Sequence, residues 1–303
     1  MNVRATFWGG LILFLAAGLQ AEMQICEFLP EQVETSLFSV EPLAFEGLRK
    51  KPLDQDVTCL VAPCYRLARL PLKSWPKGLP KRSTGTTFTI CSYAHYSTLL
   101  SVMKRLGVTH IFACNPRNDI PSQGIKLIPI LHAPRNAAGP AADKDILYSF
   151  VGCLHTSVNR VKVRHDMVRL PKRSDVVIKW RSRWNPQGEA EINEYIDINS
   201  RSRFGLCPRG TFLNTIRFPE LLKAGAIPVV LADGWRLPAG IDWKKCAIFV
   251  KERDALKVDK IIRSISPDVE EAMRKECLRV SALLEDDPAY FIRYYFNQRL
   301  SSK

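Results

Sequence analysis

From residue 86 onward, short apolar runs alternate with segments in which apolar residues recur every three or four positions. The short runs, bounded by turn residues, are typical of strands buried on both faces of a parallel sheet. The periodic segments, several of which end at glycine, are typical of helices. We predict strands at 87–91, 108–114, 126–131, 146–152, 176–180, 204–207, 226–231 and 247–250, and helices at 95–106, 215–224, 254–264, 267–284 and 290–300.

This alternation predicts an α/β fold with parallel strands. The segment AAGPAAD at 137–143 breaks the pattern and has the composition of a linker. We therefore expect an N-terminal Rossmann-like domain at 22–140 and a C-terminal domain at 144–300. Residues 22–82 carry many prolines and basic residues that obscure any period, so the N-terminal domain is expected to be the reduced one.

The most informative stretch is 202–243, where a strand, a turn, a helix and a second strand follow one another. This order implies a right-handed parallel crossover. The turn Pro208-Arg209-Gly210 precedes a helix that we expect to begin at Thr215. Backbone N–H groups at such a turn and helix start favour a phosphate.

Two charged residues on that helix add to the prediction of an anion site. Arg209 in the turn and Arg217 on the helix are planar cations that suit diphosphate oxygens. Glu220 lies three residues after Arg217, on the same helix face, and could accept hydrogen bonds from ribose hydroxyls. An exposed Arg217/Glu220 ion pair is the alternative on spacing alone.

The formal net charge of +14 over 303 residues makes the chain strongly basic. Such a surface favours acidic partners, among them nucleic acid, anionic lipid, acidic polysaccharide and nucleotide sugars. The chain has no helix-turn-helix, zinc-finger or RNA-recognition signature, so we expect no nucleic-acid partner.

The N-terminus has the pattern of a targeting segment. Arg4 precedes an uncharged run from Ala5 to Ala21. Residues 1–21 can be a signal peptide cleaved before Glu22, or an uncleaved signal anchor that holds the chain at a membrane. The sequence leaves both interpretations open.

Nine cysteines are present, and in an oxidising compartment some could pair, for example Cys59 with Cys64. Cys114, Cys207 and Cys246 lie in apolar runs and are expected to be buried free thiols. No Cys/His set has zinc spacing. The Asp54-Gln55-Asp56 triplet has the spelling of a metal-binding Asp-x-Asp, but no convincing strand precedes it, so we predict no metal ligands.

The stretch 202–243 resembles the exostosin family of glycosyltransferases, glycosyltransferase family 47. That family's pattern is roughly S-x-F-C-L-x-P-R-G, then R-x-x-E, G-x-I-P-V, a short acidic turn, L-P and D/N-W. Gly205 stands where the family usually has cysteine. The matching residues are Ser202, Phe204, Leu206, Pro208, Arg209, Gly210, Arg217, Glu220, Gly225, Ile227, Pro228, Val229, Asp233, Gly234, Trp235, Leu237, Pro238, Asp242 and Trp243.

A second part of the resemblance lies upstream, and together the two parts cover roughly 144–296. Phe150 and Gly152 match the family's F-x-G, and Arg160 and Arg164 fall where the family has an arginine-containing helix. Four residues apart, these arginines can face one anion. The basic residue that usually follows the glycine is absent, and Cys153 stands there.

The resemblance implies a GT-B-like architecture, two Rossmann-like domains facing across a cleft. It implies an inverting glycosyltransferase that moves a sugar from a UDP-sugar to a glycan or glycoprotein acceptor, which the basic charge suggests is acidic. No cofactor or metal is required, because arginines neutralise the leaving diphosphate, and the catalytic base is not identified. The expected donor-binding residues are Gly152, Arg160, Arg164, Pro208, Arg209, Gly210, Thr215, Arg217 and Glu220.

The resemblance also implies a Golgi membrane protein of type II with a lumenal domain, whereas a cleaved signal peptide would make it secreted or periplasmic. An oligomer with another transferase is a further expectation. The alternative function is a non-catalytic exostosin-like protein that binds an acidic glycan or partners an active transferase. The missing basic residue after Gly152 favours this alternative.

Overall fold

We describe the fold from a computed structural model. It describes residues 4–8, 11–15, 23–28, 40–61, 64, 85–92, 96–117, 119, 121–155, 161–183 and 188–300. The chain forms two compact units. The first comprises Met1–Leu131, Pro238–Gly240 and Asp287–Lys303, and the second comprises His132–Leu237 and Ile241–Asp286.

The first unit is built on a seven-stranded sheet whose spatial order follows the chain. The first three strands pair antiparallel, and every later neighbour pair is parallel. This sheet is larger than expected for a reduced N-terminal domain. Its first two strands fall in the predicted targeting segment, and prolines and basic residues obscure the pattern around the next two. The strands are β1 (Arg4–Trp8), β2 (Leu11–Leu15), β3 (Gln24–Phe28), β4 (Val57–Val61), β5 (Thr86–Cys91), β6 (His110–Ala113) and β7 (Lys126–Pro129).

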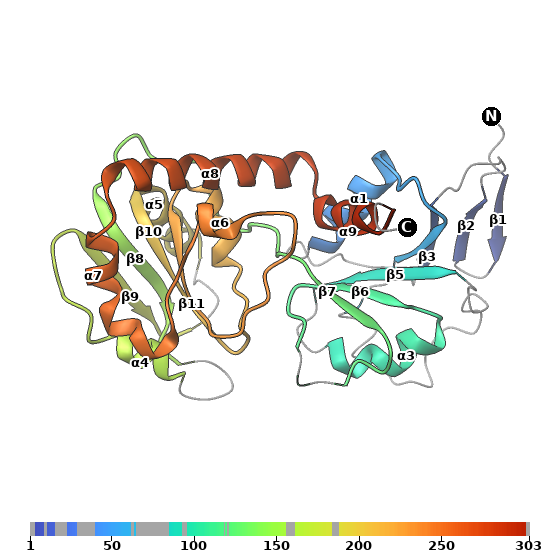
Figure 1. The fold of residues 1–303 in the computed structure, drawn as a ribbon, viewed down its shortest axis with the longest axis horizontal. Coiled ribbons are helices and arrows are strands. Elements are labelled where there is room, and N and C mark those ends of the chain that lie inside the picture. The colour runs from blue at the N-terminus through green and yellow to red at the C-terminus, as the bar shows by residue number, and fades with distance from the viewer. Residues whose placement is uncertain are drawn as a thin grey trace. The chain divides into compact units, whose positions relative to one another are not determined.

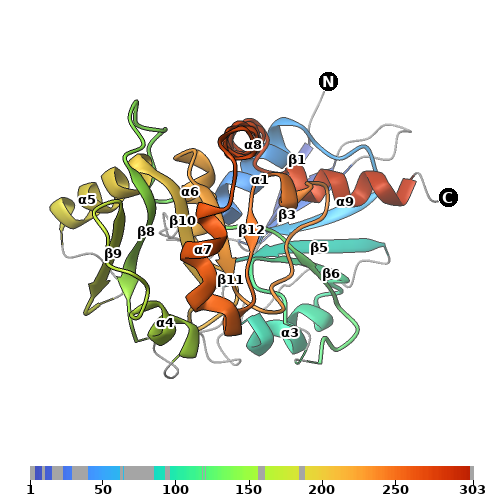
Figure 2. The same cartoon turned by 60° about the vertical axis from the view of Figure 1, so that its left-hand side comes forward.

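Helices cover both faces of this sheet, with α1 (Val40–Lys50) and α9 (Tyr290–Leu300) on one face and α3 (Leu100–Arg105) on the other (Figures 1 and 2). The helix predicted at 95–106 begins as a 3-10 turn, η2 (Tyr96–Leu99), and ends before Gly107 at a φ of 80°. Helix α1 was not predicted, because its apolar positions lie in a region rich in prolines and charges.

Residues of the predicted targeting segment form strands where the structure describes them. Residues 4–8 and 11–15 are β1 and β2, which pair antiparallel. The rest of residues 1–21 and the basic loop at 70–83 lie outside the described residues. Within the described part of the chain, no helix has the length and apolar character needed to span a membrane. The signal-peptide and anchor interpretations stay predictions.

The second unit holds a five-stranded sheet in the order β12-β11-β10-β8-β9, in which every neighbour pair is parallel. The predicted α/β class is therefore confirmed. The strands are β8 (Ile146–Cys153), β9 (Val176–Arg181), β10 (Ser202–Pro208), β11 (Ile227–Leu231) and β12 (Ile248–Phe249).

Helices α5, α6 and α8 contact the strands of this sheet, and α6 also packs against α8 (Figure 1). Helices α4 and α7 meet through η4. These elements are α4 (Lys162–Met167), α5 (Glu189–Arg201), α6 (Arg217–Lys223), η3 (Trp243–Lys245), η4 (Glu252–Lys257), α7 (Val258–Arg263) and α8 (Pro267–Asp286).

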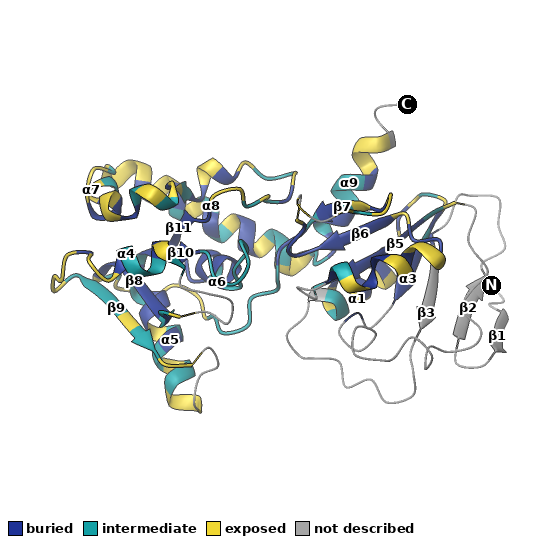
Figure 3. Ribbon diagram, turned by 90° about the horizontal axis from the view of Figure 1, so that it is seen from below, coloured by how far each residue is buried: buried dark blue, intermediate teal, exposed yellow. Residues whose placement is uncertain are grey.

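The core of the second unit lies on its central strands, which are buried along most of their length (Figure 3). Phe204 and Leu206 on β10 are fully buried. A Cβ atom on Gly205, between them, would lie only 2.3 Å from Cδ2 of Leu221. Glycine at this position therefore lets α6 pack directly on β10, and Leu221 fills the space of the family's usual cysteine.

The order of the second sheet creates a switch point between β8 and β10. These strands are neighbours, but the chain leaves β8 toward β9 on one side and leaves β10 toward β11 on the other. In open α/β sheets, ligands bind beyond the carboxyl ends of strands at such a point.

The unit boundaries differ from those expected. The second unit begins at His132, before the linker at 137–143, and α9 belongs to the first unit rather than the second. Phe296 on α9 explains the assignment of α9, because its ring lies 5.2 Å from that of Phe88 on β5 and 5.9 Å from that of Phe112 on β6. How the two units face one another stays a prediction of the family resemblance.

Candidate functional site

A pocket opens in the second unit at the carboxyl ends of β8 and β9, beside the start of α6. Its empty volume is about 740 Å³, including the part open to solvent. The position is the one that the strand order favours for a ligand. The pocket is lined by Arg135, Asn136, Val151, Gly152, Cys153, Arg164, Arg181, Ile192, Tyr195, Thr215, Ile216, Arg217 and Glu220.

Arg217 is the first residue of α6 and is only 9% exposed. Its guanidinium carbon lies 4.4 Å from the ring centre of Phe150, and Nη2 donates a hydrogen bond to the carbonyl oxygen of Val151. Its Nε has no hydrogen-bond partner among the described residues. A Cβ atom on Gly152 would lie 3.0 Å from Arg217 Nη2, so glycine at this position leaves room for the guanidinium.

Arg164 on α4 brings a second, half-buried cation to the same pocket. Its Nε donates to the carbonyl oxygen of Arg209 at 2.8 Å, and its Nη1 donates to that of Cys153. Burial, followed by the charge of Arg217, lowers the pKa of Arg164 to about 10. The two arginines therefore repel one another inside the pocket.

Within the described part of the chain, neither Arg164 nor Arg217 forms an ion pair with a carboxylate. Carbonyl oxygens satisfy some of their donors but do not neutralise their charge. Two cations beside the single carboxylate of Glu220 leave this part of the pocket positively charged, and an anionic ligand would offset the cost of that charge. The geometry therefore favours an anion in this pocket.

Arg181 is a pocket residue that the sequence analysis did not identify. It is the last residue of β9, and its side chain lies 3.9 Å from Glu191 and 3.7 Å from Glu194. These carboxylates balance the charge of Arg181, whereas the charges of Arg164 and Arg217 are not balanced by an ion pair. Its place at the carboxyl end of a predicted strand was the available signal.

Glu220 is 2% exposed and holds the wall of the pocket together. Its Oε2 accepts a hydrogen bond from the Tyr195 hydroxyl at 2.6 Å, and its Oε1 accepts from the amides of Asn136 at 2.8 Å and Arg135 at 3.3 Å. Burial raises the pKa of Glu220, and these donors oppose the rise. The alternative of an exposed Arg217/Glu220 ion pair is wrong, because both residues are buried.

This arrangement also bears on the expected role of Glu220. Arg135 and Asn136, which follow the predicted strand at 126–131, belong to the second unit and line the same pocket as Glu220. A carboxylate offers about four acceptor positions. Three are occupied, so ribose binding by Glu220 stays a prediction that depends on the fourth.

The turn after β10 lies behind the pocket rather than in its lining. The amide of Arg209 donates to Leu231 at 2.9 Å, and that of Gly210 donates to Phe212 at 3.0 Å. These two amides are therefore already used, which the prediction of phosphate-binding N–H groups did not foresee. Pro208, the last residue of β10, and Gly210 support the site indirectly, since a Cβ atom on Gly210 would lie 3.2 Å from Arg164 Nη2.

The remaining predicted site residues have mixed outcomes. Thr215 lines the pocket, but α6 begins at Arg217, whose amide donates to Thr215 Oγ1 at 3.3 Å. Arg160 lies outside the described residues. Asp54 and Asp56 are exposed and directly precede β4, at the amino end of that strand. This is the edge of a parallel sheet at which ligands are not expected.

The Exostosin GT47 domain model matches residues 94–265, more than half of the 303-residue chain. The chain belongs to the exostosin GT47 family. This is a family of glycosyltransferases, as the residues of 202–243 predicted. Every residue that lines the pocket of the second unit lies within the matched region.

Curated relatives agree over shorter segments. The chain is 45% identical to the exostosin-1 homolog of Caenorhabditis elegans over 75 residues, which cover 24% of this chain and 20% of the relative. It is 33% identical to exostosin-1 of Drosophila melanogaster over 150 residues, which cover 45% of this chain and 20% of the relative. It is 38% identical to exostosin-1 of Mus musculus over 90 residues, which cover 29% of this chain and 12% of the relative. The chain thus spans a fifth or less of the length of these exostosins.

Among solved structures, TarM matches with a TM-score of 0.43 and 8% identity, over 84% of this chain and 57% of TarM. A GtfA/B complex matches with a TM-score of 0.38 and 12% identity, over 97% of this chain and 65% of that one. These scores are too low to add to the family assignment.

Proposed function

We propose that this exostosin-family chain is an inverting glycosyltransferase that transfers a sugar from a UDP-sugar to a glycan or glycoprotein acceptor. The observation that carries the proposal is that Arg164, half-buried, and Arg217, buried, share one pocket and form no ion pair with a carboxylate among the described residues. A diphosphate supplies the missing negative charge, and arginine suits its oxygens.

In this proposal the pocket acts on the leaving group. Negative charge builds on the departing UDP in the transition state, and fixed cations that face it lower the barrier. Arg164 and Arg217 supply that charge, so the proposal requires no metal ion or cofactor. Gly152 keeps Arg217 close to β8, and Glu220 holds Tyr195 and Asn136 in place. The base that takes the acceptor proton is not assigned.

The test is calorimetric titration of the full chain with UDP, beside Arg217→Met and the control Arg253→Met. Methionine keeps most of the arginine stem and its contact with Phe150 but removes the charge. Loss of a charged hydrogen bond should weaken UDP binding by about 10- to 100-fold. Arg253 is an exposed arginine of the same unit, so its replacement should leave UDP affinity unchanged.

Thermal unfolding of the same proteins separates a binding role from a structural one. Arg217→Met removes the repulsion between Arg217 and the half-buried Arg164, so we expect a melting temperature equal to or above that of the wild type. A large drop would mean that Arg217 serves the fold. Failure of the wild type to bind UDP or any other nucleoside diphosphate would overturn the proposed enzyme.

A second candidate is a non-catalytic exostosin-like protein that binds an acidic glycan or supports an active transferase. Cys153 favours it, because this nearly buried thiol lines the pocket where the family usually has a basic residue. Incubation with several UDP-sugars and glycan acceptors distinguishes the two functions. Release of UDP that depends on the acceptor supports the enzyme, whereas UDP binding without release supports the alternative.

We also propose a location in the secretory pathway, on the basis of the family and of the apolar run at the N-terminus. A type II Golgi anchor and a cleaved signal peptide remain the two forms of this proposal. The net charge of +14 supports an acidic acceptor. Assembly with a second transferase is part of the same proposal and rests on the exostosin family alone.

A further inference from the structure

Three cysteines lie at the carboxyl edge of the sheet in the first unit. Strands β4, β5 and β6 are parallel neighbours, so their carboxyl ends share one edge. Cys64 follows β4, Cys91 ends β5 and Cys114 follows β6. The amide of Cys114 donates a hydrogen bond to the carbonyl oxygen of Cys91 at 3.4 Å, so the backbones at these two cysteines are neighbours.

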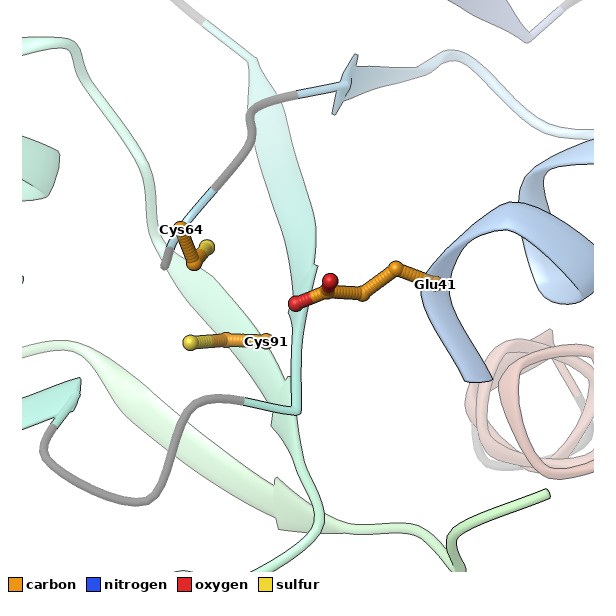
Figure 4. A group of neighbouring side chains, drawn as sticks. All are labelled: Glu41, Cys64 and Cys91. Atoms are coloured by element: carbon orange, nitrogen blue, oxygen red, sulfur yellow. The ribbon is translucent and has the colours of Figure 1, made fainter. Parts of the chain in front are cut away.

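Glu41, the second residue of α1, reaches this edge from the helix side (Figure 4). The thiol sulfurs of Cys64 and Cys91 and a carboxylate oxygen of Glu41 all lie within 4.8 Å of one another. Cys64 is 0% exposed and Cys91 is 2% exposed. Three potential metal ligands from three separate elements therefore converge on one small, buried volume.

The carboxylate of Glu41 is held in position. Its Oε1 accepts a hydrogen bond from the amide of Ser92 at 2.7 Å, directly after Cys91. An outer-shell hydrogen bond of this kind is typical of carboxylates that bind metals, because it orients the other oxygen. Glu41 thus resembles a positioned ligand more than a solvated surface charge.

We propose that Glu41, Cys64 and Cys91 bind a zinc ion that joins α1 to the carboxyl edge of the sheet. Two thiolates with one carboxylate suit zinc better than calcium or magnesium, which prefer oxygen ligands alone. Zinc with bonds of about 2.3 Å to sulfur and about 2.0–2.2 Å to oxygen holds its ligands about 3–4 Å apart. The three side chains therefore need only a small inward shift.

Binding releases two thiol protons to solvent and forms two Zn–S bonds and one Zn–O bond. A water molecule takes the fourth position. The sequence analysis found no zinc spacing, because the ligands lie far apart along the chain and meet only in the sheet. This site lies in the first unit and does not depend on the proposed donor pocket.

The test begins with the full chain, purified with a thiol reductant and without chelator, and assayed for zinc by mass spectrometry. We expect about one zinc ion per chain. Exchange with cobalt(II) chloride should give thiolate-to-cobalt charge transfer and the intense visible absorption of tetrahedral cobalt. Absence of zinc and of a cobalt spectrum would overturn the proposal.

Variants then assign the ligands. Cys64→Ser and Cys91→Ser should lose the metal, whereas the control Cys277→Ser, which changes a buried thiol of the second unit, should retain it. Glu41→Gln can still accept the Ser92 hydrogen bond, so it tests the ligand without removing that contact. Its zinc affinity should fall at least about tenfold.

Circular dichroism of each variant checks that the chain has folded, and Glu41→Gln keeps the test decisive if a serine variant unfolds. Retention of zinc by Cys64→Ser and Glu41→Gln would overturn the proposal. A Cys64–Cys91 disulfide would also overturn it. Peptide mapping of the chain purified without reductant would detect this disulfide, and circular dichroism would show whether the oxidised chain keeps its fold. In that case the thiols would form a covalent link instead of a metal site.

Discussion

At the scale of single residues, the second unit depends on glycines that let side chains approach the backbone. Gly205 is the clearest case, because Leu221 occupies the space that a side chain would need. The family's usual cysteine at this position cannot fit unless the Leu221 side chain moves. The sequence revealed the departure, and the structure gives its reason.

We predict that Gly205→Cys destabilises the chain by about 1–3 kcal/mol, the usual cost of overpacking a core. Leu221→Ala alone should also destabilise it, since it leaves a cavity. The double variant should be more stable than the sum of the two losses implies, because cysteine then fills part of the cavity. Urea unfolding gives the free energy of unfolding of the wild type, the two single variants and the double variant. If the losses of the two single variants simply add up in the double variant, the explanation is wrong.

His110 is a second residue whose environment decides its chemistry. Nη1 of Arg299 donates a hydrogen bond to Nε2 of His110 at 3.1 Å, because a guanidinium can only donate. The proton of the neutral ring therefore lies on Nδ1, which donates to Thr109 Oγ1 at 2.8 Å. Burial, then the charges of Arg299 and Lys126, lower the pKa of His110 to about 4. The ring is therefore neutral in the folded chain and has a structural role.

This pKa predicts a loss of stability in acid. The unfolded chain binds the His110 proton with a pKa of about 6.5. Between that value and about 4 the unfolded state holds more protons, so stability falls as pH decreases through this window. We expect the contribution of His110 to be about 1–2 kcal/mol, since solvent screens the partly exposed cations.

The variant His110→Phe keeps an aromatic ring beside Tyr295 and Phe296 but cannot titrate. Its unfolding midpoint should fall less than that of the wild type between neutral pH and pH 5. His132 of the second unit, whose pKa burial also lowers to about 4, will retain part of the dependence. If the unfolding midpoint falls equally in both proteins, His110 does not contribute to the loss of stability in acid.

At the scale of secondary-structure elements, the ends of helices decide how the second unit is assembled. The Nζ of Lys144 donates to the carbonyl oxygens of Ser200 at 2.8 Å, Ser202 at 2.9 Å and Ala224 at 2.9 Å. Helix ends leave carbonyl groups without a partner in the helix. One ammonium group thus joins the end of α5, the start of β10 and the end of α6.

We predict that Lys144→Met lowers the free energy of unfolding by about 1–3 kcal/mol, because it leaves these carbonyl groups unsatisfied. Lys172→Met, at an exposed site of the same unit, is the control and should have little effect. Hydrogen exchange at the amides near 200–202 and 224 locates the loss. Unchanged protection there would mean that water replaces the ammonium at no cost.

At the scale of the whole molecule, the chain returns to its first unit after completing the second. Phe296 on α9 is 1% exposed and packs on Phe88 and Phe112 of the first sheet. The domain boundaries drawn from the sequence separate α9 from that sheet. A fragment that ends at residue 140 would therefore lack part of the core of the first unit.

We predict that Phe296→Ala destabilises the first unit by about 3–5 kcal/mol, the usual cost of deleting a buried phenylalanine. Hydrogen exchange should accelerate at β5 and β6, which contact the ring. The amides of β10 and β11 in the second unit serve as the internal comparison. Equal acceleration in both sheets, or none in β5 and β6, would contradict this assignment of α9.

Local patterns determined much of the fold in advance. Buried parallel strands are short apolar runs, so the sequence predicted every strand from β5 to β12, and periodic apolar positions predicted α6 to α9. β1 and β2 were missed because their apolar run was assigned to a targeting segment. β3, β4 and α1 were missed because prolines and charges interrupt the pattern around them. The family followed from the ordered residues of 202–243, since a motif depends on residue identity and spacing alone.

The tertiary structure alone decided which residues meet. Arg181 and Tyr195 join Gly152, Arg164 and Arg217 in one pocket because parallel strands bring distant carboxyl ends to one edge of the sheet. For the same reason Glu41, Cys64 and Cys91 converge in the first unit. The return of α9 depends on aromatic packing between segments almost two hundred residues apart along the chain. Sequence spacing carries no information on such contacts, because they arise from topology and long-range packing and not from local preference.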